Sequence, residues 1–289
     1  MNTDFPVWRS MLFVPAHVDK FVAKAHTRGA QAYILDLEDS VPLAQKAAAR
    51  QTLVAGAVQV SQSGAAALVR VNAQPELLAP DLDAAVDPAI RAIVLPKVND
   101  ADTVAAVTAR LDALEAARGM PAGHTLLIAQ IEDVRALPQL DAIASASPRL
   151  MGMMLGSEDF SVSAGMEPTP ETLFAPNQMV AFACRRAGIL PLGFPASIAD
   201  FSDLEAFRDT IRRARQLGFV GAFCIHPSQA AVMNEEFAPS AAELEHARAL
   251  LGAFEDARAQ GRGAFEFQGR MVDPPVVARA QELLRRGAR

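Results

Sequence analysis

Cysteine is scarce in this sequence, and the two cysteines that occur stand far apart. Cys184 and Cys224 form no C-x-x-C pair and lie in no cluster with histidine. Neither a disulfide framework nor a cysteine-based zinc site is therefore expected. The stretch MNTDFPVWRS at positions 1–10 also lacks a basic segment followed by an apolar one, the pattern of a secretory signal. These features predict a reduced, cytoplasmic protein.

Long apolar runs and blocks of positive charge are missing as well. No apolar run approaches the roughly 20 residues that a membrane-spanning helix needs. The 27 Lys and Arg residues are outnumbered by 33 Asp and Glu residues, and the net charge is -6. This balance argues against nucleic acid or a membrane as the main partner and favours a small molecule. With 289 residues, 51% of them hydrophobic, the chain can bury a large core.

Eight short apolar segments recur along the chain, separated by amphipathic, Ala-rich stretches such as 101–118 and 203–218. Their apolar residues are continuous rather than alternating, which is typical of parallel strands covered on both faces. Strands that alternate with helices over roughly 250 residues predict a (β/α)8 barrel. A doubly wound open sheet is the alternative, but no G-x-G-x-x-G follows the first strand. The expected strands span residues 10–14, 32–37, 67–71, 92–96, 125–131, 150–155, 189–194 and 220–225.

The sequence beyond the last expected strand exceeds what a barrel requires. Residues 234–261 predict a long helix that begins at Ser240, and residues 261–287 predict a turn, a short extended piece and a final helix. We therefore expect a barrel over residues 1–235 and a C-terminal helical extension over residues 236–289.

Polar side chains follow most of the expected strands. In a barrel the C-terminal ends of all strands open onto one face, so these side chains should converge. Carboxylates from neighbouring strands repel one another unless a cation lies between them, and two carboxylates with open water positions suit Mg²⁺. Glu132 and Asp159, after the fifth and sixth strands, are the natural pair. The polar residues at the strand ends are Glu38, Asp39, Arg70, Asn72, Lys97, Glu132, Asp133, Glu158, Asp159 and His226.

Several of these residues also have a purely structural interpretation. Asp133 is favoured as a helix cap, and Asp159 has the same option. Arg70, inside an apolar strand, either neutralises the acids or binds an anionic substrate. Lys20 and Lys24, four residues apart on the first expected helix, form a solvated face or meet phosphates at the rim of the barrel.

The same choice applies to three further residues. Glu38 and Asp39 either bind backbone amides in the turn before Pro42 or take part in the site. His226, which precedes Pro227, is more often a packed turn residue than a metal ligand, and no second histidine lies nearby in the sequence.

Eight motifs in order along the chain resemble the citrate lyase β-subunit-like family of CoA-ester lyases, within the HpcH/HpaI aldolase/citrate lyase family. The resemblance extends from about residue 9 to residue 285 and is strongest to the citramalyl-CoA and malyl-CoA lyases. The motifs are RSMLFVPA, YILDLEDSVP, VRVN, IVLPK, QIED, LGSEDF, CIHPSQ and GAFEFQGRMVDPP.

This resemblance implies a TIM barrel of the phosphoenolpyruvate/pyruvate superfamily type that uses Mg²⁺, with Mn²⁺ as a possible substitute. It implies a homo-oligomer, a trimer or hexamer, in which the C-terminal extension covers the active site of a neighbouring subunit. The implied reaction is a reversible Claisen-type cleavage of a 3-hydroxy dicarboxylic acyl-CoA, giving acetyl-CoA and a 2-oxo acid such as pyruvate or glyoxylate.

The resemblance also implies roles for particular residues. Glu132 and Asp159 would hold Mg²⁺, and Glu132 would also lie against the substrate. Arg70 would contact the acyl part of the substrate and stabilise the enolate, with Asp273 as the catalytic acid/base. Glu38 and Asp39 would orient metal-bound waters and Arg70. The implied contacts of the CoA ester are Phe13, Lys20, Lys24, Ile225 and His226.

Three positions depart from the family's usual pattern and leave the acyl group open. Ala16 replaces the commoner Gly, Phe13 stands where relatives often carry Tyr, and Asp133 stands where they often carry Thr or Ser. The alternatives are a citrate lyase β subunit acting on an acyl-carrier thioester, a malyl-CoA thioesterase or malate synthase-like enzyme, and a catalytically silent barrel.

Overall fold

The computed structural model describes residues 5–261 and 263–287. Residues 1–4, 262 and 288–289, which fall inside the two expected domains, lie outside the described residues. The chain divides into two compact units, Met1–Phe237 and Ala238–Arg289.

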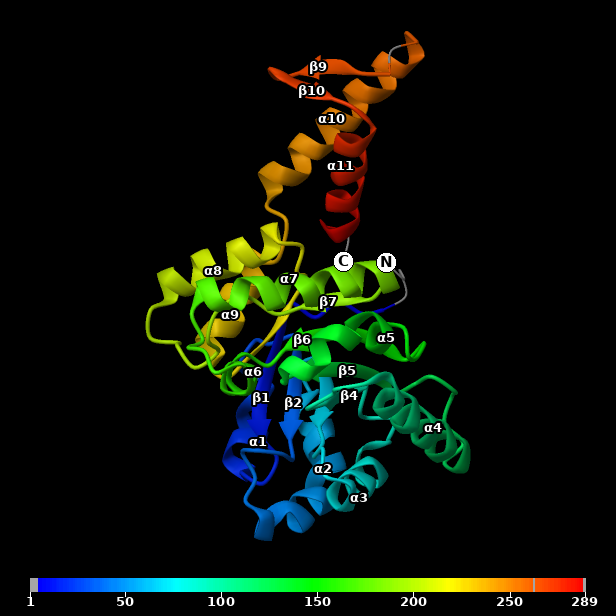
Figure 1. Ribbon diagram of the computed structural model, residues 1–289, viewed down its shortest axis with the longest axis vertical. Helices are drawn as coiled ribbons and strands as arrows, with labels where there is room; N and C mark the ends of the chain where they lie inside the picture. The colour runs from blue at the N-terminus through cyan, green and yellow to red at the C-terminus, as the bar shows by residue number, and fades with distance from the viewer. Residues whose placement is uncertain (1–4, 262, 288–289) are drawn as a thin grey trace. The chain divides into compact units, whose positions relative to one another are not determined.

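The first unit is built around a parallel sheet whose strands follow one another in chain order (Figure 1). Strands β1 to β7 pair with their neighbours in sequence, and β8 pairs with β1. The flanks of β7 and β8 are joined by backbone hydrogen bonds from Gly193 N–H to Gly221 O (2.9 Å) and from Val220 N–H to Pro191 O (3.1 Å). These bonds bring the two ends of the sheet together, so the predicted barrel is confirmed and the open sheet was the wrong alternative. The strands are β1 Ser10–Pro15, β2 Ala32–Asp36, β3 Ala66–Arg70, β4 Ala92–Leu95, β5 Leu126–Ile131, β6 Leu150–Leu155, β7 Leu190–Leu192 and β8 Ala222–Cys224.

Helices connect the strands, and two of them confirm the helices expected over 101–118 and 203–218. Each begins at an aspartate cap: Asp100 accepts from Thr103 N–H, and Asp203 accepts from the amides of Glu205 and Ala206. The helices of this unit are α1 Asp19–Ala25, α2 Lys46–Val60, α3 Pro75–Ala85, α4 Ala101–Ala117, α5 Leu140–Ala144, α6 Ser157–Ala164, α7 Pro170–Ala187, α8 Leu204–Gln216 and α9 Pro227–Glu236, with short 3₁₀ turns η1 Leu43–Gln45 and η2 Val134–Gln139.

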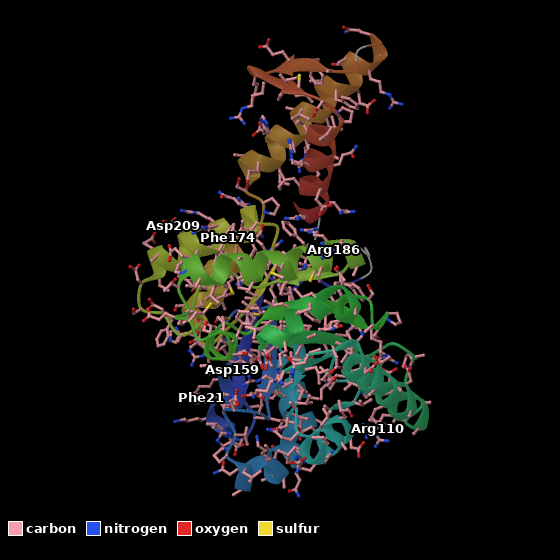
Figure 2. The ribbon with its side chains drawn as sticks, in the orientation of Figure 1. Phe21, Arg110, Asp159, Phe174, Arg186 and Asp209 are labelled. Atoms are coloured by element: carbon pink, nitrogen blue, oxygen red, sulfur yellow. The ribbon has the colours of Figure 1, made fainter. Side chains whose placement is uncertain are left out.

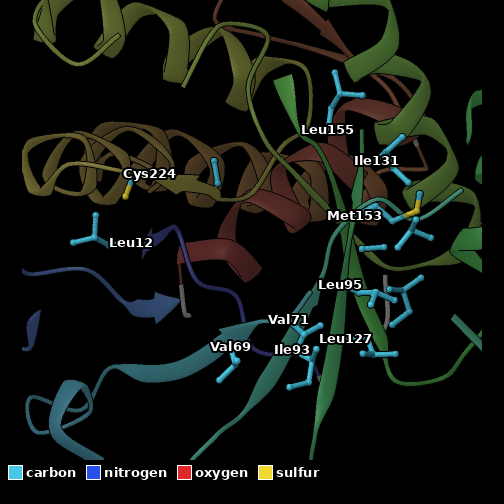
Figure 3. Close-up of a cluster of buried hydrophobic side chains, with 14 of the residues drawn as sticks. Leu12, Val69, Val71, Ile93, Leu95, Leu127, Ile131, Met153, Leu155 and Cys224 are labelled. Atoms are coloured by element: carbon cyan, nitrogen blue, oxygen red, sulfur yellow. The ribbon is translucent and has the colours of Figure 1, made fainter. Parts of the chain in front are cut away.

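Both faces of the strands are apolar, which explains the continuous hydrophobic runs. Alternate side chains such as Ile34, Val94 and Phe223 form one buried cluster that fills the barrel. The residues between them, among them Val69 and Leu127, belong to a second cluster shared with the surrounding helices (Figure 3). Side chains of a strand point alternately to its two faces, so the inward-facing positions can be followed to the end of each strand.

The second unit is a helical hairpin with a small β-ribbon. It contains α10 Ala241–Ala259, the antiparallel strands β9 Phe265–Phe267 and β10 Arg270–Val272, and α11 Pro274–Gly287. Ser240 caps α10 in a capping box with Glu243, as the sequence predicted. The ribbon turns at Gln268 and Gly269, which both have positive φ, as a tight two-residue hairpin requires. Its core consists of Ala247, Leu250, Val272, Val277 and Ala280.

No helix in the described part of the chain combines the length and apolar character needed to cross a membrane.

Gly221 offers a test of how the ends of the sheet are brought together. A Cβ on Gly221 would meet the carbonyl oxygen of Trp8 and lie 3.0 Å from its carbonyl carbon, and backbone atoms cannot turn away. We expect Gly221→Ala to lower the free energy of unfolding by about 1–3 kcal/mol, as overpacking usually does. The measurement is the urea midpoint at unchanged m-value.

Gly252→Ala is the matched control. Gly252 lies inside α10, and a Cβ there meets no atom within 4 Å. This change should raise stability by about 0.5–1 kcal/mol, because Ala loses less backbone entropy than Gly in a helix. Similar effects of the two substitutions would show that Gly221 is not closely packed.

Candidate active site

The inward-facing residues of neighbouring strands change from apolar to polar at their C-terminal ends. On β2, Asp36 follows the interior residue Ile34, and on β3, Arg70 follows Leu68. The parallel register places Asp36 directly beside Arg70. On β5 the same alternation brings Gln130 and then Glu132 to the mouth of the barrel.

Arg70 is held by three carboxylates. Its Nε donates to Asp36 Oδ1 (2.7 Å) and its Nη2 to Asp36 Oδ2 (2.8 Å), so this pair is bidentate. Its Nη1 lies 2.9 Å from Glu38 Oε2 and 3.4 Å from Asp39 Oδ2. The guanidinium carbon also lies 4.7 Å from the centre of the Phe13 ring, a cation–π contact. The predicted neutralising role of Arg70 is therefore observed, together with its contacts to Glu38 and Asp39.

Asp36 is a site residue that sequence reasoning missed. It is 1% exposed and also accepts hydrogen bonds from the amides of Glu38 (3.0 Å) and Ser40 (3.1 Å) and from the Ser40 hydroxyl (2.6 Å). Burial opposes its charge, but the hydrogen bonds and the charge of Arg70 outweigh that effect and lower the pKa of Asp36. The available signal was an acid embedded in the apolar run AYILDL at an inward-facing position.

Two buried side chains, Lys46 at the start of α2 and Asn72 just after β3, bind the backbone that follows β2. Lys46 Nζ donates to the carbonyl oxygens of Leu37 (2.7 Å) and Glu38 (2.8 Å). Asn72 Nδ2 donates to Leu37 O (2.9 Å) and to Asp81 Oδ2 (2.6 Å). These bonds hold the Glu38 backbone in place beside Arg70.

Glu132, directly after β5, is buried in a niche that only a glycine neighbour leaves open. A Cβ on Gly156, after β6, would lie 2.5 Å from Glu132 Cγ. Glu132 is 5% exposed, and its Oε2 accepts a hydrogen bond of 3.1 Å from Lys97 N–H. The pKa of Glu132 is raised to about 8, chiefly by burial and then by the negative charges of Glu38 and Asp159, while the positive charges of Arg70 and Lys97 oppose the rise.

Asp159 lies exposed in the first turn of α6, where Figure 2 labels it, and lines the same cavity as Glu132. The described residues contain no group of three or more His, Cys, Asp or Glu side chains arranged to hold a metal ion. Two carboxylates that follow neighbouring strands, one of them buried with a raised pKa, fit a hard divalent ion that keeps water or substrate oxygens in its other positions. The donor set therefore fits Mg²⁺.

Arg70 and the carboxylates of Asp36, Asp39, Glu132 and Asp159 line a cavity of about 510 Å³ at the mouth of the barrel. Apolar side chains complete it, among them Phe13, Met154 and Phe223. A second cavity of about 430 Å³ shares Phe13, Pro15 and Ile225 with the first. The two cavities are thus neighbours across these shared residues.

The second cavity gathers most of the residues that sequence reasoning assigned to the CoA ester. Phe13, Lys24, Ile225 and His226 all line it. Lys20 lies beside it, with Nζ 5.1 Å from the centre of the Phe21 ring, which forms part of the wall. Arg28 adds a second cation that the sequence did not single out, because it follows α1 in a turn and matches no motif.

Two residues have a demonstrated structural role at helix starts. Asp133 caps η2 by accepting from Arg135 N–H (2.9 Å), which confirms the favoured interpretation. His226 caps α9, with Nδ1 2.7 Å from the Ser228 hydroxyl, and its ring stacks on Phe201 at 4.9 Å. His226 is exposed, so it is a helix cap in the cavity wall rather than the packed turn residue that was expected.

Asp273 belongs to the second unit. It precedes α11, where its Oδ1 accepts from Val276 N–H at 3.3 Å. Within its own unit Asp273 is a helix cap, and its catalytic assignment stays a prediction.

Comparison with known proteins agrees with this geometry. The sequence profile of the HpcH/HpaI aldolase/citrate lyase family matches residues 9–227. The chain belongs to this family. Citrate lyase subunit beta of Leuconostoc mesenteroides subsp. cremoris is 34% identical over 282 residues, covering 96% of this chain and 92% of that protein. L-malyl-CoA/beta-methylmalyl-CoA lyase of Rhodobacter capsulatus is 34% identical over 305 residues, covering 96% and 93%.

A solved structure extends the family relationship. CitE from Mycobacterium tuberculosis, in complex with magnesium, acetoacetate and coenzyme A, matches with a TM-score of 0.77 and 31% identity. The match covers 98% of this chain and 99% of that one. The predicted family is confirmed, and the protein is a lyase of the HpcH/HpaI aldolase/citrate lyase family.

The buried pair of Asp36 and Arg70 gives a testable stability effect. Asp36→Asn leaves the Arg70 guanidinium buried with a neutral partner at two of its nitrogens. We expect the free energy of unfolding to fall by about 3 kcal/mol, the lower end for breaking a buried pair, because Glu38 still faces Arg70. Chemical denaturation at neutral pH measures this loss.

Asp39→Asn is the control for the Asp36 substitution. The Asp39 side chain is 60% exposed and lies 3.4 Å from Arg70. Its removal should cost no more than about 1 kcal/mol, as for other solvent-exposed pairs. A loss at Asp39 as large as that at Asp36 would contradict the assignment of Asp36 as the main partner of Arg70.

Proposed function

We propose that this protein is an Mg²⁺-dependent carbon–carbon lyase. Its substrate would be a 3-hydroxy dicarboxylic acyl-CoA of the citramalyl-CoA or malyl-CoA type, cleaved to acetyl-CoA and pyruvate or glyoxylate. One observation carries the proposal: an acidic cavity with a fixed arginine adjoins a second cavity whose wall contains Lys24 and Arg28. The first cavity suits the hydroxy acid, and the second suits an anionic thioester carrier.

Glu132 and Asp159 would hold the cation. When bound, Mg²⁺, or Mn²⁺ in its place, supplies a Lewis acid for the oxygens of the hydroxy acid. Glu132 must be ionised to serve as a ligand, so its raised pKa couples cation binding to loss of a proton.

The CoA ester would lie across the residues shared by the two cavities. Lys24 and Arg28 are placed to meet its phosphates, with Lys20 beside them, and Phe21 and His226 offer apolar surface. The thioester end would then pass Phe13 and Ile225 into the acidic cavity, which brings the reacting carbons next to Arg70.

In the cleavage direction the C3 hydroxyl would give its proton to solvent in the cavity, and the C3–O group would become the carbonyl of the 2-oxo acid as the C2–C3 bond breaks. The electron pair of that bond would become the enolate of the acetyl thioester. Arg70 is placed to stabilise that enolate oxygen. It has five N–H donors, and its contact to the exposed Asp39 is the longest at 3.4 Å, so a substrate oxygen can replace Asp39 most easily. One preorganised donor is typically worth about 3–4 kcal/mol to such a step.

Asp273 would donate the proton that C2 needs, and would remove it in the condensation direction. The second unit carries this residue, and we propose that it covers the active site of a neighbouring subunit in a homo-oligomer, a trimer or hexamer. Catalysis would then depend on assembly as well as on the barrel.

A second candidate is a citrate lyase β subunit that acts on an acyl-carrier thioester. The relative of that name is as similar to this chain as the malyl-CoA lyase, at 34% identity each. Assays of the purified protein with (R)- and (S)-citramalyl-CoA, malyl-CoA and 3-hydroxy-3-methylglutaryl-CoA separate the two candidates. Acetyl-CoA release without partner subunits supports the free CoA ester as substrate, while release of free CoA would indicate hydrolysis.

Mg²⁺ affinity should depend on pH because the pKa of Glu132 is about 8 without a cation. The cation binds the ionised form, so affinity should rise by up to about tenfold per pH unit between pH 6 and 8 and level off above. Isothermal titration in buffers of different ionisation enthalpy should show release of up to about one proton at pH 7.

Glu132→Gln is the control for the proton that is released. This variant should bind Mg²⁺ weakly and release no proton. Wild-type affinity that does not change with pH would remove Glu132 from the metal site.

Asp273→Asn should lower kcat by at least about 100-fold, because general acid–base catalysis is usually worth 10²–10⁴. Asn is as good a helix cap as Asp, so folding should be preserved. Mg²⁺ and CoA binding should stay near wild type, as measured by calorimetry alongside steady-state kinetics.

Asp256→Asn, on the exposed face of α10, removes the same charge from the same unit and should leave kcat unchanged. Full turnover in Asp273→Asn would remove that residue from the mechanism.

A further inference from the structure

Lys97 has a backbone conformation that its residue type avoids. Its φ is +56°, and among the described non-glycine residues it shares a positive value only with Gln268, in the hairpin turn of the second unit. Glycine is the residue that such a position normally favours. A lysine here indicates that its side chain has a use that outweighs the conformational cost.

The left-handed turn aims one amide into the mouth of the barrel. β4 ends at Leu95, and after the turn Val98 N–H donates to Gln130 O at 3.1 Å, so the chain pairs with β5 again. Between these points Lys97 N–H donates to Glu132 Oε2 at 3.1 Å. The amides of Lys97 and Val98 lie on either side of the backbone dihedrals of Lys97, so its left-handed conformation sets the direction of one relative to the other.

The side chain of Lys97 reaches a different carboxylate. Its Nζ lies 2.9 Å from Glu38 Oε1, while Glu38 Oε2 lies 2.9 Å from Arg70 Nη1. Both oxygens of Glu38 therefore face a cationic side chain. Glu38 is 4% exposed and close enough to Glu132 for its charge to act on it.

We propose that Lys97 is a positioning residue with two separable roles in the metal site. Its amide orients the Glu132 carboxylate so that Oε1 is left for the cation. Its ammonium forms an ion pair with Glu38, so that this second buried carboxylate does not compete with Glu132 for the same ion. The inference rests on the proposed function and explains why Glu132, rather than Glu38, would be the ligand.

Four substitutions separate the amide from the ammonium. Lys97→Met keeps an unbranched side chain and removes only the charge. Lys97→Val removes the charge and adds a β-branch that opposes positive φ. Lys97→Gly removes the charge and relaxes the backbone, and Lys97→Arg restores a cation.

The role of the amide is tested by measuring the Mg²⁺ affinity of the variants by calorimetry without substrate. We expect Lys97→Met and Lys97→Gly to agree within about threefold, and Lys97→Val to bind about tenfold more weakly than Lys97→Met, as other residues behind a metal ligand do when changed. Equal affinity of the Val and Met variants overturns this role. If circular dichroism shows that Lys97→Val is unfolded, Lys97→Ala against Lys97→Gly makes the same comparison.

The role of the ammonium is tested by measuring kcat and KM at saturating Mg²⁺. Lys97→Met should lose about tenfold in kcat with little change in KM, and Lys97→Arg should recover most of that loss. Wild-type kcat in Lys97→Met overturns this role. Absence of Mg²⁺ binding in the wild-type protein would instead overturn the proposed function and this inference with it, so the two failures can be told apart.

Discussion

The arrangement of the site depends on how a few buried carboxylates are neutralised at the mouth of the barrel. An isolated buried charge is costly, so each must find a cation or take up a proton. Asp36 is neutralised by the bidentate Arg70, and Glu38 is shared between Arg70 and Lys97. Glu132 receives an amide and no direct ion pair among the described residues, and its pKa is raised to about 8. Glu132, which lines the same cavity as Asp159, is thus the buried carboxylate whose charge is least neutralised by its neighbours.

The barrel brings these charged side chains together because its parallel strands surround one interior and end on the same face. The apolar interior ends where the strands end, and the next inward-facing positions carry the charges. Small residues then make room for them: Gly156 leaves the space that the Glu132 carboxylate occupies. Beneath the site, Lys46 and Asn72 tie the Glu38 backbone to the scaffold. These hydrogen bonds hold the charged side chains in one arrangement before a substrate binds, as preorganised catalysis requires.

The two units divide the proposed chemistry between them. The barrel carries the proposed cation ligands, the Arg70 guanidinium and the two neighbouring cavities. The second unit carries Asp273 on the N-terminal side of α11, where the helix cap holds the carboxylate in a fixed orientation within that unit. In the proposed mechanism, Arg70 and the proton donor Asp273 belong to different units, so proton delivery would depend on assembly of the site.

Much of this protein could be predicted from local sequence patterns. The apolar runs located all of the barrel strands, and the caps at Asp133 and Ser240 followed from the chemistry of helix starts. The convergence of Glu132 and Asp159 on one cavity followed from the rule that barrel strands end on one face. These features depend on periodicity and on element order, which one chain displays directly.

Only the tertiary structure identified Asp36 and Arg28 as parts of the site, and only it showed what Lys97 contacts there. The pairing of Asp36 with Arg70 depends on the register between β2 and β3, and the Lys97 amide reaches Glu132 only through a left-handed turn. Arg28 enters the second cavity because a turn after α1 folds back toward Ile225 and His226. Register, backbone dihedrals and the approach of distant segments result from packing the whole chain, so no local pattern specifies them.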